Sequence, residues 1–134
     1  MLILDVFVPV KPIPYKRIEG STKRFVNKSE IEYRGHISNF CRLHMSHNGL
    51  EDTVINYPIY VDIDISFFRR KNDKKSYADR LYGDIDNHAK SILDALNGVV
   101  IEDDSLVQKL SISKNLVDPI EIAGQGVRIR IFKL

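Results

Sequence analysis

Disulfides, membrane spans and a strong net charge are all missing from this sequence of 134 residues. The one cysteine, Cys41, cannot form a disulfide within the chain, which fits the reducing cytoplasm. No apolar run approaches the ~20 residues that span a bilayer. Residues 1–5 reach an acidic residue at once and lack the basic segment that opens a signal peptide. We therefore expect a cytoplasmic protein without a membrane partner.

Net charge says little, because the formal value is only +2 at pH 7. The distribution of charge says more, since acidic residues gather at 84–86 and 102–104 and basic clusters precede them in the chain. Basic flanks can hold a phosphate polymer while an acidic centre holds a metal ion, although solvated surface loops would show the same clusters. The basic residues concerned are Lys16, Arg17, Lys23, Arg24, Arg69, Arg70, Lys74 and Lys75.

Alternating apolar residues predict four strands, at residues 2–9, 59–68, 106–114 and 127–131. Residues 99–101 indicate a further short buried strand or an extended run. The pattern is cleanest in 59–68, where one face should be buried and the other polar. The residues expected to face inward are Ile59, Val61, Ile63, Ile65 and Phe67, then Leu106, Leu110 and Ile112, and last Val127, Ile129 and Ile131.

Two segments have the apolar spacing of helices. The first follows a capping-box pattern at residues 27–30 and extends to about His47. The second begins near Asp86 or Asn87 and ends at residues 97–98. The expected apolar faces are Tyr33, Ile37, Phe40, Cys41 and His44 in the first helix, and Ile85, Ala89, Ile92, Leu93 and Leu96 in the second.

The length and the order of these elements predict the architecture. A chain of this size suits one domain, residues 1–134, and the sequence has no repeat, low-complexity segment or boundary. The predicted order is β-α-β-α-β-β-β. We therefore expect an α+β fold of two layers, in which two main helices pack on one face of a mixed β-sheet.

Asp84 and Asp86 stand two residues apart just before the second predicted helix. In an extended segment, residues i and i+2 point the same way, so both carboxylates can converge on one hard cation such as Mg²⁺. Lys90 lies one helical turn beyond Asp86 and could meet a phosphate oxygen. Asp94, another turn along, could anchor Lys90. The spacing therefore indicates a candidate metal site with a cation beside it.

Spacing alone leaves other interpretations open. An aspartate before a helix is a common N-cap, and a second such pair, Asp62 and Asp64, could simply belong to the polar face of a strand. His36, His44 and His47 lie within reach of one another on the first helix. Histidines on helices are more often packing or surface residues than metal ligands, so these three are a weak alternative.

The acidic group at residues 102–104 favours the site at Asp84 and Asp86. It follows a short apolar run directly after the helix, so a returning strand can bring Asp103 or Asp104 towards the first pair. Clustered carboxylates repel one another unless a cation compensates them. A metal site explains such an arrangement better than a structural role does, provided that the groups converge.

Residues 83–98, followed by residues 100–104 and then Lys114, resemble the core of the RusA-type Holliday junction resolvases. The family pattern is roughly D-x-D-N-x-x-K-x-x-x-D-x-L, a short gap, D-D, and then a strand that ends in lysine. Every position of that pattern is met here, spacing included. The layout before it is similar more loosely, with a strand, a proline-containing basic segment and a polar helix.

The resemblance implies a homodimeric, Mg²⁺-dependent endonuclease of phage or prophage origin, with Mn²⁺ as a possible substitute. Such enzymes bind four-way junction DNA and nick two opposed strands, here in the cytoplasm of a bacterial or phage-infected cell. Asp84, Asp86 and Asp104 would be the metal ligands and Lys90 the catalytic lysine. Auxiliary residues would be Asp103, Asp94 and Asn87, and Lys114 would contact DNA or phosphate.

Two rival functions remain open at this point. In the first, the basic segments bind DNA or a junction, the acidic cluster is structural, and no catalysis occurs. In the second, the chain is a phosphohydrolase that acts on nucleotides or RNA.

Overall fold

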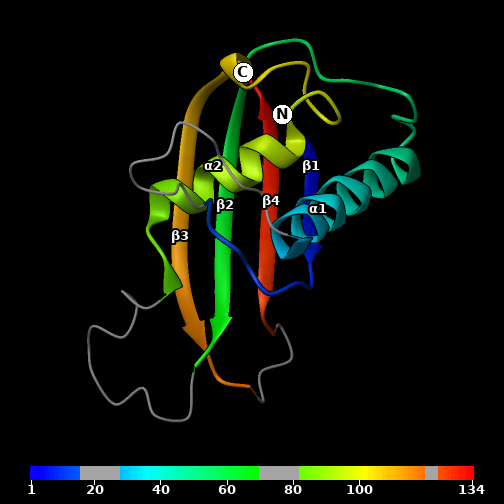
Figure 1. Ribbon diagram of the computed structural model, residues 1–134. Coiled ribbons are helices and arrows are strands. Elements are labelled where there is room, and N and C mark those ends of the chain that lie inside the picture. The colour runs from blue at the N-terminus through cyan, green and yellow to red at the C-terminus, as the bar shows by residue number, and fades with distance from the viewer. Residues whose placement is uncertain (16–27, 70–81, 120–123) are drawn as a thin grey trace.

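The computed structural model describes residues 1–15, 28–69, 82–119 and 124–134 (Figure 1). The segments with alternating and helical apolar patterns form strands and helices close to the predicted ranges, although the second helix begins one residue earlier than predicted. The described elements, in chain order, are β1 (Leu2–Val8), α1 (Lys28–His47), β2 (Ile59–Phe68), α2 (Ile85–Leu96), the 3-10 turn η2 (Asp104–Leu106), β3 (Val107–Val117) and β4 (Gly126–Lys133).

The four strands form one mixed sheet in the order β1-β4-β2-β3. β4 pairs antiparallel with both β1 and β2, whereas β2 and β3 are parallel. Parallel neighbours need a long crossover, and the segment that contains α2 supplies it. Figure 1 shows α1 and α2 on the same face of the sheet. The predicted class, α+β with two helices packed on one face of a mixed sheet, is confirmed.

The core lies between the sheet and the two helices. The predicted inward residues of β2 and β4 are all buried, because a period of two places every second side chain under the helices. None of the described helices is long and apolar enough to cross a membrane. The buried apolar residues of the three best-covered strands are Leu4, Val6, Val8, Ile59, Val61, Ile63, Ile65, Phe67, Val127, Ile129 and Ile131.

Three predicted faces need correction. On α1 the buried row continues from Cys41 to Met45, because successive steps of four residues follow one ridge of the helix, and His44 is exposed. Ile85 and Leu110 were expected inside but are 42% and 38% exposed. Both lie beside a hollow between α2 and the edge strand β3 rather than under a second layer.

The run at residues 99–101 does not form a strand. Ile101 makes only isolated bridges to Ile55 and Asn97, and the backbone N–H groups of residues 99–101 all bond to the carbonyl of Leu96. Val100 and Ile101 are nevertheless fully buried. This apolar run therefore forms a buried turn at the C-terminal end of α2, and η2 follows soon after it.

The face of the sheet opposite the helices is polar and carries the competing aspartate pair. Arg130 Nη1 lies 2.8 Å from Asp62 Oδ2, and Asp64 accepts a hydrogen bond of 2.6 Å from the Ser113 hydroxyl. Asp62 and Asp64 are thus members of a cross-strand charge network on β2, β3 and β4. These cross-strand contacts account for the presence of Asp62 and Asp64 on the polar face without a metal ion.

Candidate functional site

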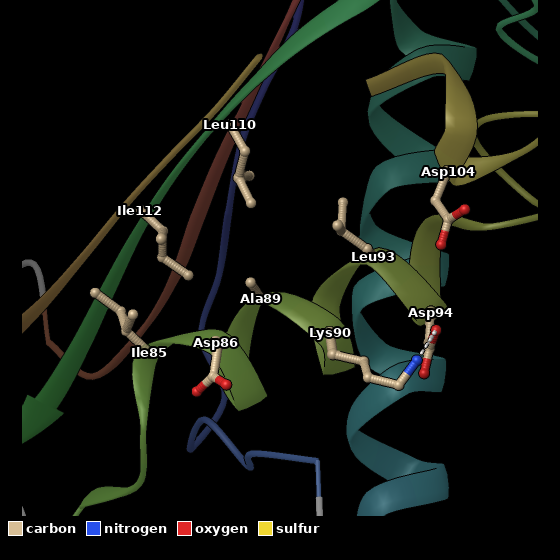
Figure 2. Close-up of a pocket in the computed structure, with 9 residues that line it drawn as sticks. All are labelled: Ile85, Asp86, Ala89, Lys90, Leu93, Asp94, Asp104, Leu110 and Ile112. Carbon is tan, nitrogen blue, oxygen red and sulfur yellow. Dashed lines mark ion pairs between the residues drawn. The ribbon is translucent and has the colours of Figure 1, made fainter. Parts of the chain in front are cut away.

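A pocket of about 440 Å³ opens between α2, η2 and β3 (Figure 2). Residues from both acidic segments of the sequence line this pocket, Asp86 from the first and Asp104 from the second. Its apolar residues come from α2 and from β3, and its charged groups lie along α2 and at the start of η2. The lining residues are Ile85, Asp86, Ala89, Lys90, Leu93, Asp94, Asp104, Leu110 and Ile112.

The charged wall of the pocket follows from the periodicity of α2. Asp86, Lys90 and Asp94 recur every four residues, so they lie on one side of the helix. Lys90 Nζ is 3.8 Å from Asp94 Oδ1, the pair that the spacing predicts. Figure 2 shows the Lys90 side chain extending towards Asp94 and away from Asp86. The ammonium group also lies 5.0 Å from the centre of the Tyr15 ring.

Asp104 comes to the same pocket from η2, because the chain turns at residues 99–103 and returns beside α2. The carboxylates of Asp86 and Asp104 are exposed and make no hydrogen bond or ion pair with any residue that the structure describes. Carboxylate oxygens are ligands that a hard divalent cation prefers. Asp86 and Asp104 are therefore candidate ligands, although Figure 2 shows them on different sides of the pocket, with Asp104 closer to Asp94.

Asp84 and Asp103 lie differently. Asp84 occupies the N-cap position of α2 without a side-chain capping bond, and it is exposed outside the pocket lining. Asp103 caps η2 by accepting hydrogen bonds from the hydroxyl and the backbone N–H of Ser105, which lower its pKa. Within the described ranges, no three histidine, cysteine or acidic residues are grouped closely enough to hold a metal ion.

Two side chains contact the backbone carbonyls just before Asp84. Lys114 Nζ donates a hydrogen bond of 2.7 Å to the Gly83 carbonyl, and the Nε2 atom of His88 lies 2.7 Å from the Tyr82 carbonyl. His88 is fully buried, and burial lowers its pKa. The family resemblance implies that Lys114 contacts DNA or phosphate, and this stays a prediction. In the structure its ammonium group holds the backbone just before Asp84.

Gly83 occupies a conformation that other residues rarely adopt, with a φ of 91°. A Cβ there would lie 2.8 Å from Cγ of Pro14 and 3.1 Å from Nε2 of His88. We predict that Gly83→Ala lowers the free energy of unfolding by about 1–3 kcal/mol, measured by urea denaturation. Gly49→Ala is the control, since Gly49 also has positive φ but has open space around it. Equal losses in both variants would contradict the packing argument.

Only part of the predicted DNA-binding set can be placed. The backbone N–H of Arg69 donates to the Val117 carbonyl at the end of the β2–β3 pair. The predicted contacts at Lys16, Arg17, Lys23, Arg24, Arg70, Lys74 and Lys75 lie outside the described residues. Tyr15, the last described residue before the first of these segments, donates its backbone N–H to the Asn87 carbonyl of α2.

Two residues of α1, Glu30 and Arg34, lie near the site although the sequence indicated no such role, only a capping-box position for Glu30. Arg34 Nη2 lies 3.0 Å from Oε1 of the buried Glu30 and 3.4 Å from Oδ2 of Asp94, so α1 touches the charged wall of the pocket. Their four-residue spacing within α1 was a visible signal for the Glu30–Arg34 pair. The contact with Asp94 depends on how the two helices pack, and the sequence carries no sign of it.

Comparison with known proteins bears on the family of this chain. No curated protein matches this sequence closely. The family model described as Endodeoxyribonuclease RusA matches residues 8–131, a range that begins at the end of β1 and reaches into β4. It therefore includes both helices, the turn η2 and every residue that lines the pocket. With nearly its whole length matched, the chain belongs to the RusA family of endodeoxyribonucleases.

Proposed function

We propose that this chain resolves four-way DNA junctions by Mg²⁺-assisted hydrolysis of one phosphodiester bond in each of two opposed strands. Membership of the RusA family supports the general activity, a Holliday junction resolving endonuclease. The observation that carries the finer proposal is the pocket itself. Its lining includes Lys90 and two carboxylates without a partner among the described residues, Asp86 and Asp104.

Asp86 and Asp104 are the residues that would hold the cation, and Asp84 is the third carboxylate within the same sequence motif. Nucleases of this family generally use a divalent metal, and Mg²⁺ suits oxygen ligands from a few carboxylates, with Mn²⁺ as a substitute. When bound, such an ion compensates charge at the scissile phosphate and lowers the pKa of water. Asp86 from α2 and Asp104 from η2 would hold the cation at the pocket.

Lys90 supplies the positive charge that the reaction needs at phosphorus. Its side chain is half exposed, and 3.8 Å from Asp94 is too long for a hydrogen bond, so the ammonium group can turn to a phosphate oxygen. Negative charge grows on those oxygens as water attacks, and a fixed cation stabilises that state. The product would carry a 5′-phosphate, as in the resemblance on which the residue assignment rests.

Paired nicks require two copies of this pocket, and a two-fold homodimer would supply them in a symmetric arrangement that suits an open junction. Binding would come mainly from the basic residues in and beside segments 16–27 and 70–81. Contacts of this kind hold phosphates without reading bases, so junction affinity should fall steeply as salt rises.

The test is cutting of a synthetic mobile four-way junction, with the nick positions mapped on all four strands. We predict symmetric nicks in two opposed strands that require Mg²⁺ or Mn²⁺ and stop when the metal is removed by a chelator. Duplex, flap, RNA and nucleotide substrates serve as controls. Junction binding without nicking in either metal would support a non-catalytic binding module, and preferred hydrolysis of RNA or nucleotides would support a different phosphohydrolase.

A further inference from the structure

A line of four charged side chains connects the interior of the protein to the pocket. Glu30 and Arg34 belong to α1, and Asp94 and Lys90 belong to α2. Successive members are 3.0, 3.4 and 3.8 Å apart. The line begins at a buried carboxylate and ends at the half-exposed ammonium group of Lys90.

The buried end of the line fixes Arg34. A carboxylate that is removed from water is costly unless it is paired, and Glu30 is only 2% exposed. Arg34 supplies the pairing one turn further along the same helix. Its guanidinium group is therefore held in one place, and the same nitrogen atom, Nη2, faces Asp94 across the helix–helix contact.

Asp94 divides its charge between two cations. Arg34 meets Oδ2, and Lys90 meets the other oxygen, Oδ1, at a longer distance. Neutralisation of one oxygen by a fixed guanidinium weakens the attraction that the carboxylate exerts on Lys90. Without Arg34, the whole negative charge of Asp94 would act on Lys90 and hold its ammonium group at Asp94, where it is less free to turn to a phosphate.

We propose that Arg34 is a positioning residue that acts through Asp94 to keep Lys90 available to the scissile phosphate. The inference rests on the proposed role of Lys90 in cutting. It goes beyond the pocket, because Arg34 lines no part of it and lies on the other helix. Glu30 takes part by pairing with Arg34 and is not among the residues that line the pocket.

The positioning role of Arg34 can be separated from a purely structural role, in which Arg34 only joins α1 to α2. The helices have a separate connection, since the Ser38 hydroxyl lies 2.6 Å from the Ala95 carbonyl, so loss of Arg34 need not separate them. Arg42 is the matched control. It is another arginine of α1, and it donates to the carbonyls of Thr53 and Val99, far along the helix from Asp94.

The first measurement needs no DNA. The Cε–Hε NMR signals of lysine are recorded for the wild type and for Arg34→Gln, and Lys90→Arg identifies the signal of Lys90 by its loss. We expect Arg34→Gln to shift the Lys90 signal and Arg42→Gln to leave it unchanged. An unshifted Lys90 signal in folded Arg34→Gln would overturn the proposal, whether or not the wild type cuts junctions.

The second measurement is cutting of junction DNA at saturating enzyme. Partners that orient a functional group typically change activity by about 10- to 100-fold, and we expect Arg34→Gln to lower the maximal rate about tenfold with unchanged junction affinity. In the Asp94→Asn background, Arg34→Gln should have no further effect. Additive losses, or a wild-type rate in Arg34→Gln, would overturn the proposal. A wild type that cuts nothing would instead count against the proposed function.

Discussion

Asp86→Asn should abolish Mg²⁺-dependent nicking of a four-way junction while junction binding persists. The carboxylate of Asp86 faces the pocket without a partner among the described residues, so its removal takes a negatively charged oxygen from the place where a cation would bind. Changes to groups that merely support a metal ligand cost about 10- to 100-fold. Loss of a ligand itself should therefore lower the cutting rate by more than about 100-fold.

Binding should respond in the opposite sense. A carboxylate beside a DNA backbone repels phosphate, so the amide should leave junction affinity unchanged or slightly higher when metal is absent. Glu51→Gln is the matched control, because it removes one negative charge at an exposed position outside the pocket. Nicking by Asp86→Asn at the wild-type rate would refute the assignment, and loss of binding as well as cutting would indicate a misfolded variant.

The elements of this fold were predictable wherever a single period governed a buried face. Strand β2 lies in the middle of the sheet with all its odd-numbered residues under the helices, and its alternation gave both its limits and its buried face. The edge strand β3 was harder. Leu110 obeys the same alternation but faces the pocket, because no helix covers that part of the edge.

The part of the site that lies on α2 was predictable from the sequence. The way in which the following turn brings a residue to α2 was not. Helix geometry alone places Asp86, Lys90 and Asp94 on one side, and the structure has them there. The choice between Asp103 and Asp104 depended on a turn that the sequence does not define. The structure turns Asp104 into the pocket and uses Asp103 to cap η2.

Contacts between elements distant in the chain could not be predicted at all. The family resemblance implied a functional role for Lys114, but its bond to the Gly83 carbonyl depends on where β3 passes the start of α2. The same limit applies to Asp62, whose partner Arg130 lies 68 residues further along the chain. Local periodicity contains no information about such pairs.

Lys90→Met should lower the maximal cutting rate by about 100- to 1000-fold, the usual loss when one group that stabilises a transition-state charge is removed. Methionine keeps a long unbranched stem, so the packing along α2 should survive. Lys109→Met is the control, because Lys109 lies on the opposite face of the sheet, over the Tyr60 ring. The Lys109→Met variant also loses one positive charge, and we expect it to cut junctions at the wild-type rate.

Metal concentration should separate Lys90 from Asp86. If Asp86 holds the cation, Asp86→Asn binds metal more weakly, and higher Mg²⁺ or Mn²⁺ should restore part of its activity. Lys90 acts on the phosphate, so no metal concentration should restore Lys90→Met. Rates for both variants across a metal titration, measured by single-turnover cutting of one junction, test this division. Restoration of Lys90→Met by metal would mean that Lys90 acts on metal binding instead of on the charge at phosphorus.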